Sequence, residues 1–431
     1  MIDPTIGFTS DVIRDPDRFV GRADLIRQCC HALNSPTGLI AVYGKRGVGK
    51  SSLLRQVQQM ALVDYKLATL AGLSHEVPSR PKKYLTVYYT CDSTIGNAGD
   101  LLSRLCNDQE DEDGLLRLVP DDGKDIVEFT RTKEVGAGAD LKVINWGVKG
   151  IETTKYARRV PDDIFQTFRN FTNAIIVQQV KKRMRRDGLL VLLDEFDVIR
   201  DKSALGSLIK SMSTPQLKFG ICGVGRDLMD LIRDHQSVER LIEEGSIKVS
   251  PMSLSEAVKV LDRAEELFDG KVKIAESVKK AIASISQGYP YLIQLLGKEC
   301  VMAANQRNVT TIDDDILSPV LSKIAEGEAF PNLESTYLRA IGNSKDRQVL
   351  LHLLADIEDD NVNVHNEQFE RVLLKDVRRE ADDLQVKYID QQLPRLEDKR
   401  FGSVIARVPD TNGIYEFTDP VFRLYVKLRK F

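Results

Sequence analysis

The stretch from Gly44 to Ser51 constrains this chain more than any other, because it sets three glycines, a lysine and a serine at fixed spacing. It reads Gly-Lys-Arg-Gly-Val-Gly-Lys-Ser and follows the apolar run 39–43, which predicts a buried strand. The pattern G-x-x-x-x-G-K-S/T between a strand and a helix is typical of a loop whose backbone N–H groups surround phosphate oxygens. It predicts an α/β fold that binds a nucleoside triphosphate.

Each residue type in this loop has a chemical reason. Glycine allows backbone geometry that a side chain would obstruct. Lys50 is expected to reach the β- and γ-phosphates, and Ser51 to offer its hydroxyl to Mg²⁺, while the helix predicted from Ser51 to about Leu62 directs its positive dipole end at the phosphates. The alternative is a glycine turn before an ordinary helix. The candidate nucleotide-binding residues of the loop are Gly44, Arg46, Gly47, Val48, Gly49, Lys50, Ser51 and Ser52.

A second motif, at the end of the apolar run 189–193, indicates the class of phosphate chemistry. The run is continuous, as expected of a parallel strand buried on both faces, and Asp194-Glu195-Phe196-Asp197 follows it. Asp194 is expected to hold Mg²⁺, directly or through water, and Glu195 to accept a proton from the water that attacks the γ-phosphate. Two carboxylates after a strand can also begin a solvated loop, but beside a phosphate loop they favour an ATPase.

Composition bounds the remaining possibilities. The 431 residues suffice for two or three domains, and 42% apolar with 29% charged residues is ordinary for a folded chain. The net charge of −3 offers no global attraction to nucleic acid. The six cysteines show no C-x-x-C spacing, which leaves zinc and disulfide frameworks without support. No basic segment followed by an apolar one begins the chain, and no apolar run approaches ~18 residues, so we expect a cytoplasmic protein without a membrane span.

The order of apolar runs predicts a domain organisation. Strands separated by helical patterns imply a parallel sheet with covered faces, in a phosphate-loop ATPase core of the ASCE/AAA+ type over residues 1–250. From about 255 to 326 only helical periodicity is present, which predicts a helical lid over 251–338. The strand candidates of the core are 39–43, 84–90, 189–193, 218–223 and 247–249.

Residues 339–431 predict a winged helix. Asn412-Gly413 lies between the apolar runs 404–408 and 414–417 and is a hairpin turn signal. Basic and acidic residues roughly cancel in this region, so the winged helix either reads DNA or packs on the core and holds the ATPase shut. The three helices of this region are expected around 346–354, 366–374 and 386–396.

An insert at about 107–160 interrupts the core. Its acidic part, 107–125, predicts an exposed loop without catalytic function, and residues 131–160, which hold the only tryptophan, Trp146, predict a hairpin. The hairpin either caps the domain's own core or contacts a neighbouring subunit. The basic run 181–186 favours a solvated helix end, with a nucleic-acid contact as the alternative.

Three short motifs in this order resemble a known family. Phe19-Val20-Gly21-Arg22, the run ending in Asp194-Glu195-Phe196-Asp197, and Gly288-Tyr289-Pro290 are similar to prokaryotic AAA+/STAND-type ATPases. Among these, the chain resembles most the origin-recognition-like ATPases with a C-terminal winged helix. The resemblance covers about residues 19–431 and is weakest over the insert.

The resemblance implies further roles by position. Phe19 and Val20 would flank the adenine, although Val20 can equally be core packing. Pro290 would bring the lid to the nucleotide. Arg226 matches the arginine that senses the γ-phosphate in STAND ATPases, where Gly223-Val224-Gly225 replaces the polar sensor of many AAA+ proteins.

Arg240 stands where relatives carry an arginine finger, which a neighbouring subunit delivers to the γ-phosphate. The alternative is a surface or intrachain ion-pair residue. A homo-oligomer in the ATP state is therefore expected, with no membrane partner.

The function expected from these features is an ATP- and Mg²⁺-dependent switch of the AAA+/STAND class, in prokaryotic defence or regulation. The alternative is an initiator or transposition-regulator ATPase that assembles on duplex DNA through the winged helix. A protein partner is also open, whereas a small-molecule kinase is disfavoured because no substrate lid of that kind is recognisable.

Overall fold

The computed structural model describes most of the chain, namely residues 1–35, 39–107, 114–115, 118, 130–131, 142–143, 164–183, 185–202, 204–225, 245–357, 371–383, 388–408, 411 and 413–430. The chain divides into two compact units. The loop unit comprises Met1–Arg22, Gly44–Ser52 and Val249–Phe431, and the sheet unit comprises Ala23–Tyr43 and Leu53–Lys248. The division into an ATPase core, a lid and a winged helix at residues 250 and 338 stays a prediction.

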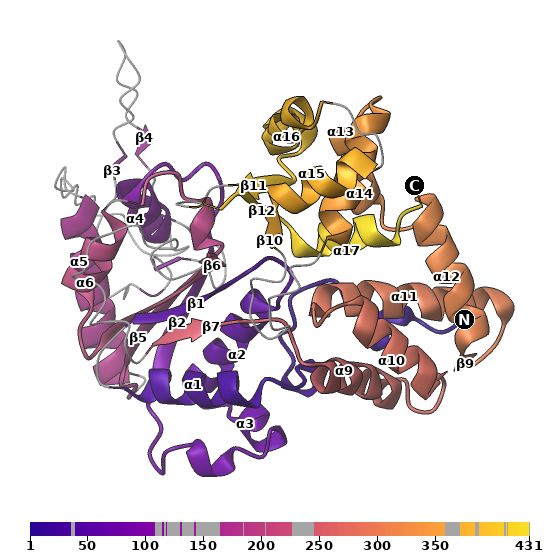
Figure 1. Cartoon of the computed structure of the whole chain (residues 1–431). Helices are drawn as coiled ribbons and strands as arrows, with labels where there is room; N and C mark the ends of the chain where they lie inside the picture. Colours follow the sequence, from indigo (N-terminus) through magenta and orange to yellow (C-terminus); the bar gives the residue numbers. More distant parts are fainter. Residues whose placement is uncertain are drawn as a thin grey trace. The chain divides into compact units, whose positions relative to one another are not determined.

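The sheet unit is built on a five-stranded parallel sheet (Figure 1). The strand order is β2-β5-β6-β1-β7, so one strand, β6, separates β1 from β5. This order is that of the ASCE class of phosphate-loop proteins, and the predicted α/β fold class is confirmed. The bounds match the five predicted strands to within one or two residues: β1 (Leu39–Gly44), β2 (Tyr84–Thr90), β5 (Gly188–Asp194), β6 (Leu217–Val224) and β7 (Ser246–Lys248).

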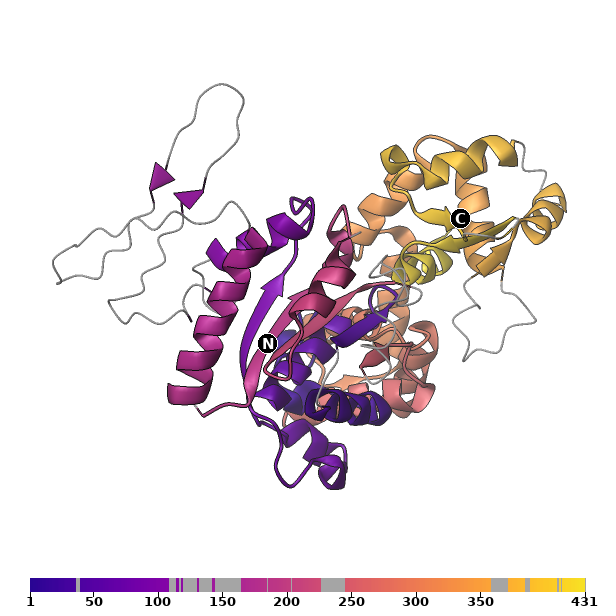
Figure 2. The same ribbon diagram turned by 90° about the vertical axis from the view of Figure 1, so that its left-hand side faces the viewer.

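Burial explains why these strands can be predicted from the sequence. Every residue of β5 is buried, because helices cover both faces of a parallel sheet. Helices α4, α5 and α6 pack with β-strand side chains in one hydrophobic core, and α1 and α2 lie on the other face (Figures 1 and 2). The helices are α1 (Ala23–Asn34), α2 (Lys50–Ala61), α3 (Lys66–Leu70), α4 (Ala98–Asn107), α5 (Ile164–Ala174), the π-helix η5 (Ile175–Arg183) and α6 (Leu205–Met212), with 3₁₀ turns η3 (Ser74–Glu76) and η6 (Phe196–Val198).

The loop unit holds the predicted lid helices. An expectation of helical structure alone between 255 and 326 was wrong, because two short strands, β8 and β9, pair in parallel between the helices. Two-residue strands leave no readable period in a sequence. The elements are 3₁₀ turns η1 (Pro4–Ile6) and η2 (Pro16–Arg18), then α9 (Leu254–Leu267), β8 (Lys273–Ile274), α10 (Glu276–Ile285), α11 (Pro290–Arg307), β9 (Thr311–Ile312) and α12 (Asp314–Glu326).

The C-terminal module, residues 331–430, has the helix and strand order expected of a winged helix. The hairpin of β11 and β12 is confirmed, and β10 adds a third antiparallel strand. The helix predicted at 366–374 is wrong for residues 371–373, because these pair with residues 414–416. The elements are α13 (Pro331–Ile341), α14 (Lys345–Asp356), β10 (Arg371–Leu373), α15 (Leu374–Asp383), α16 (Ile389–Glu397), η7 (Lys399–Phe401), β11 (Ile405–Arg407), β12 (Ile414–Phe417) and α17 (Pro420–Leu428).

Of the insert, the described residues include one antiparallel pair, β3 (Thr130–Arg131) with β4 (Lys142–Val143). This pair agrees with a hairpin, whereas Trp146 and most of the acidic loop at 107–125 lie outside the described residues. Among the helices that the structure describes, none is long and apolar enough to cross a membrane.

Candidate functional site

The loop after β1 has the backbone that its glycines predict. Gly44, Gly47 and Gly49 all have positive φ, at +152°, +78° and +93°. A Cβ on Gly47 would lie 2.8 Å from Cγ2 of Val421, so this position combines a left-handed backbone with close packing. Only glycine satisfies both requirements without strain, and the loop keeps the open geometry that a phosphate cradle needs.

The helix that follows begins inside the motif. α2 starts at Lys50, so the N–H groups of its first turn lie at the end of the glycine loop and attract anions. The Lys50 side chain is buried and its Nζ donates to the carbonyl of Lys45 at 2.7 Å, which folds the ammonium over the loop. Ser52 accepts a hydrogen bond at Oγ from the N–H of Ile13 at 3.0 Å.

Arg22 joins the loop to the start of the lid. Its Nη2 donates to the carbonyl of Val48 at 3.0 Å, and its Nη1 donates to the carbonyl of Ser250. The Arg22 backbone N–H donates to Oε1 of Glu256 at 2.7 Å, and Glu256 completes the capping box of α9 with Ser253. Burial lowers the pKa of Arg22 to about 10, only partly offset by Glu256. The sequence motif included Arg22, but its side-chain partners could not be foreseen.

The N-terminal end of α11 also lies on the loop. The Tyr291 N–H faces the carbonyl of Gly47 at 3.5 Å, and Cγ of Pro290 lies 3.9 Å from where a Cβ on Gly49 would be. The resemblance assigned Pro290 to this neighbourhood. Phe19 and Val20 are half-buried and lead into Arg22 within the same unit.

In the sheet unit, the carboxylate that ends β5 is fixed on both oxygens. Asp194 is buried, and its Oδ2 accepts a hydrogen bond from the Tyr88 hydroxyl at 2.6 Å. Its Oδ1 accepts from the Glu195 N–H at 2.9 Å. Burial, with the nearby charge of Asp194, raises the pKa of Tyr88 and keeps it a donor. The Arg55 guanidinium lies 3.4 Å from the Tyr88 ring centroid and holds the phenol in place.

The two acidic residues after Asp194 have different tasks in the fold. Glu195 is exposed and adopts a left-handed backbone, with φ 52° and ψ 34°, at the turn into η6. Such a conformation is strained for a non-glycine residue and is common at functional sites. Asp197 accepts a hydrogen bond from the Val224 N–H at 2.8 Å and so ties this turn to the end of β6.

The donor chemistry of these residues fits Mg²⁺. Mg²⁺ in proteins prefers one or two carboxylates together with substrate phosphates, and the buried Asp194 of the sheet unit supplies a carboxylate of that kind. The structure shows no group of three or more histidine, cysteine, aspartate or glutamate side chains able to hold a metal among the residues that it describes.

Two predicted site residues lie outside the described residues. These are Arg226 and Arg240, in the segment 226–244. The basic run is described in part: η5 ends at Arg183 and β5 begins at Gly188, which agrees with a helix end before the strand.

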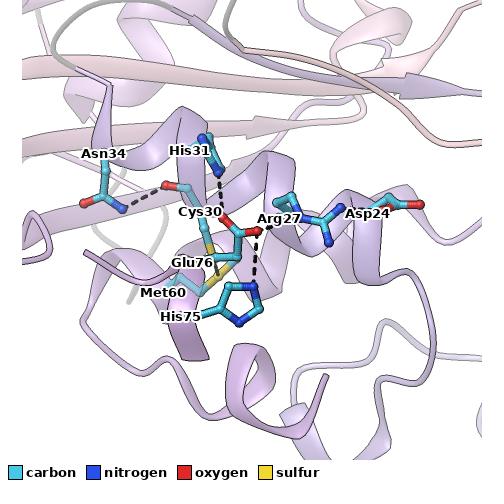
Figure 3. Close-up of polar contacts among 8 residues, drawn as sticks. All are labelled: Asp24, Arg27, Cys30, His31, Asn34, Met60, His75 and Glu76. Carbon is cyan, nitrogen blue, oxygen red and sulfur yellow. Dashed lines mark hydrogen bonds and ion pairs between the residues drawn. The ribbon is translucent and has the colours of Figure 1, made fainter. Parts of the chain in front are cut away.

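A second polar cluster, joining α1 to η3, was not foreseen from sequence (Figure 3). Glu76 accepts from Nε of Arg27 at 2.8 Å, and Nε2 of His31 lies 3.1 Å from its other oxygen. These bonds, from His31 first and then Arg27, hold the pKa of Glu76 below its usual range. Because Arg27 already neutralises this carboxylate, the cluster is a structural ion pair between two elements.

No protein-family model matches the chain, and no curated protein matches it. Solved structures are similar along its length. Cdc6p from Pyrobaculum aerophilum has 14% identity over 99% of this chain and 98% of that chain, with a TM-score of 0.44. The RuvB Holliday junction branch migration motor of Thermotoga maritima has 14% identity over 96% and 97%, with a TM-score of 0.43.

The Aeropyrum pernix ORC1 protein in complex with DNA has 10% identity over 97% of this chain and 93% of that chain, with a TM-score of 0.45. The identities and TM-scores are low, and the fold assignment rests on this chain's own strand order and glycine loop.

Proposed function

We propose that the chain is a phosphate-loop ATPase that acts as a nucleotide-dependent switch. The observation that carries this proposal is the glycine loop itself: three positive-φ glycines lead from β1 into a helix that starts at a buried lysine. A fixed, buried Asp194 with an exposed Glu195 beside it ends a second strand of the sheet that β1 belongs to. Carboxyl ends of strands in such sheets are where ligands bind.

Each residue of the proposal has a defined task toward ATP. The loop N–H groups from Gly44 to Ser52 hold the phosphates, and the Lys50 ammonium neutralises charge on the β- and γ-phosphates. The Ser51 hydroxyl and the Asp194 carboxylate would hold Mg²⁺, which supplies charge neutralisation at the phosphates. Glu195 accepts the proton of the attacking water, for which its exposed position is suited.

The remaining assignments rest on the resemblance. Phe19 and Val20 would flank adenine, and Pro290 would bring the lid to the nucleotide. Arg226 would contact the γ-phosphate within the chain, and Arg240 would act on the nucleotide of a neighbouring copy in an ATP-dependent homo-oligomer.

Charge pairing in the C-terminal module favours a switch over a DNA reader. Basic side chains near α16 and the hairpin already face carboxylates, at 2.7 Å for Arg378–Asp390, 2.7 Å for Arg400–Asp398 and 3.4 Å for Arg407–Glu397. The pair with Arg400 lowers the pKa of Asp398 to about 2. Duplex DNA requires an excess of cations toward its phosphates, which these pairs reduce.

We propose that the switch controls a protein partner, in prokaryotic defence or regulation. Assembly on duplex DNA is the second candidate, favoured by the winged-helix order of α14 to β12 and by the DNA in the ORC1 structure. In both cases ATP binding would favour one conformational state, and hydrolysis would reset it.

Binding and assembly are tested separately. Lys50→Ala should lose ATP affinity by at least about tenfold, and unchanged affinity would remove the phosphate-loop assignment. The Glu195→Gln variant should trap the ATP state, and its solution mass is measured with ATP and Mg²⁺, with and without long duplex DNA at stated salt. Assembly on ATP alone supports the switch, assembly that requires DNA supports the second candidate, and a monomer in every condition contradicts the homo-oligomer.

A further inference from the structure

The first turn of α17 lies on the phosphate loop. Cγ2 of Val421 is the nearest atom to a Cβ built on Gly47, at 2.8 Å, ahead of Tyr291 and Tyr289 of the lid. Val421 and its neighbours in α17 are buried, so this helix is packed rather than loosely placed. The last helix of the chain therefore forms part of the wall around residues 44–52.

Asp419 begins this helix beside two cations of the loop. Its Oδ1 accepts from the N–H groups of Val421 and Phe422, at 2.9 and 3.4 Å, which caps α17. Asp419 stands two residues before Val421, and Arg46 directly precedes Gly47, so the contact of Val421 with Gly47 brings this carboxylate to the loop that carries Arg46 and Lys50. The positive charges of Arg46 and Lys50 act to lower the pKa of Asp419. Burial nevertheless raises the pKa of Asp419 above its usual value, because these charges and hydrogen bonds offset desolvation only in part.

The loop cations are the groups expected to receive the nucleotide phosphates. A carboxylate in their neighbourhood attracts the same cations and repels the same phosphates. The repulsion grows with the charge of the ligand, and ATP carries one more negative charge than ADP.

We propose that Asp419 is a specificity-determining residue of the nucleotide site, which lowers affinity for ATP more than for ADP. The inference rests on the proposed function, since it uses the same phosphate loop. The Asp419 carboxylate would repel the γ-phosphate of ATP, which ADP lacks.

The test is the ratio of dissociation constants for ADP and for a non-hydrolysable ATP analogue, by calorimetry with Mg²⁺ at fixed ionic strength. Asp419→Asn and Asp419→Ser remove the charge and keep a residue that caps helices well. Both should tighten binding of the ATP analogue more than of ADP, raising Kd(ADP)/Kd(ATP analogue) by on the order of tenfold. The ratio is read within one preparation, so a lower folded fraction does not change it.

Asp313→Asn is the matched control, because Asp313 also caps a helix of the loop unit, α12, through the Ile316 N–H. Its ratio should equal that of the wild type. An unchanged or reversed ratio in both Asp419 variants overturns the inference, provided that Lys50→Ala abolishes binding. If Lys50→Ala binds both nucleotides normally, the proposed ATPase function fails. This outcome distinguishes failure of the proposed function from failure of the inference about Asp419.

Discussion

Replacing Arg22 by Met tests whether the phosphate loop depends on its anchor. Methionine keeps most of the apolar volume and removes the guanidinium. The buried carbonyl of Val48 and the half-buried carbonyl of Ser250 then lose this donor, while the backbone bond from residue 22 to Glu256 can stay.

The expected loss of stability follows from opposing effects. Burial lowers the pKa of Arg22 from its ordinary value to about 10, which corresponds to about 3 kcal/mol of cost to the charged side chain. Two hydrogen bonds from a charged donor return about 3–6 kcal/mol. Without the guanidinium, the buried carbonyl of Val48 loses this donor at a cost of about 1–3 kcal/mol. We therefore expect Arg22→Met to lower the free energy of unfolding by about 1–6 kcal/mol.

The functional effect is separable from stability by a matched variant. Lys279 is another buried cation of the loop unit, held at 2.7 Å by Asp262 and 3.0 Å by Glu265, within the lid. Lys279→Met should also destabilise the protein. Only Arg22→Met should weaken ATP binding, by about tenfold or more, because only it frees the Val48 carbonyl and lets the loop move. Equal ATP affinity of both variants, measured by calorimetry at a temperature where both are folded, would refute the reasoning.

Three further predictions concern the sheet unit. Glu195→Gln should keep ATP affinity and lower the hydrolysis rate by about 10²-fold or more, and unaltered turnover would remove the general-base role. Tyr88→Phe removes the hydrogen bond that the Tyr88 hydroxyl donates to Asp194. It should raise the Mg²⁺ concentration needed for half-maximal hydrolysis by about tenfold, and ATP affinity measured without metal should not change. Glu76→Gln should lower the melting temperature at neutral pH. Since the pKa of folded Glu76 lies below its ordinary value, its contribution is present above the unfolded pKa, near 4.3, and is lost as pH falls through the folded value. The melting temperatures of wild type and Glu76→Gln should therefore converge as pH falls from the unfolded pKa through the lower folded value, and a constant difference would contradict the ion pair.

The sheet could be predicted because its residues carry a strong signal. β5 is buried at every residue and β1 at all but one, so both appear as continuous apolar runs, and the phosphate loop has a fixed pattern of residue types. The signal fails where tertiary contacts decide the structure. Residues 371–373 have no strand pattern of their own and become β10 only through pairing with β12. The π-helix η5 could likewise not be predicted, because sequence patterns are compared with the 3.6-residue period of an α-helix.

The contacts of the candidate site were hidden for the same reason. Asp194 and Glu195 are adjacent in sequence and were predicted as site residues from their motif, whereas Tyr88, which donates a hydrogen bond to Asp194, is 106 positions away. An aromatic residue in a strand is ordinarily core, and nothing in the sequence marks its hydroxyl as a partner. Asp419-Pro420 carries a helix-start signal, but a start signal does not indicate what lies beside the helix.

Contacts to the phosphate loop come from three distant parts of the loop unit. Arg22 binds from the N-terminal segment, Tyr291 from the lid and Val421 from the last helix. A nucleotide that changes the loop must therefore change the stability of these contacts, and by thermodynamic linkage each contact changes nucleotide affinity to the same extent. A C-terminal module that binds a partner through another face would alter ATP affinity only if it also shifted α17. Among the described residues, the contact between Val421 and Gly47 links the C-terminal module directly to the phosphate loop, so a partner that moves α17 is expected to change nucleotide affinity.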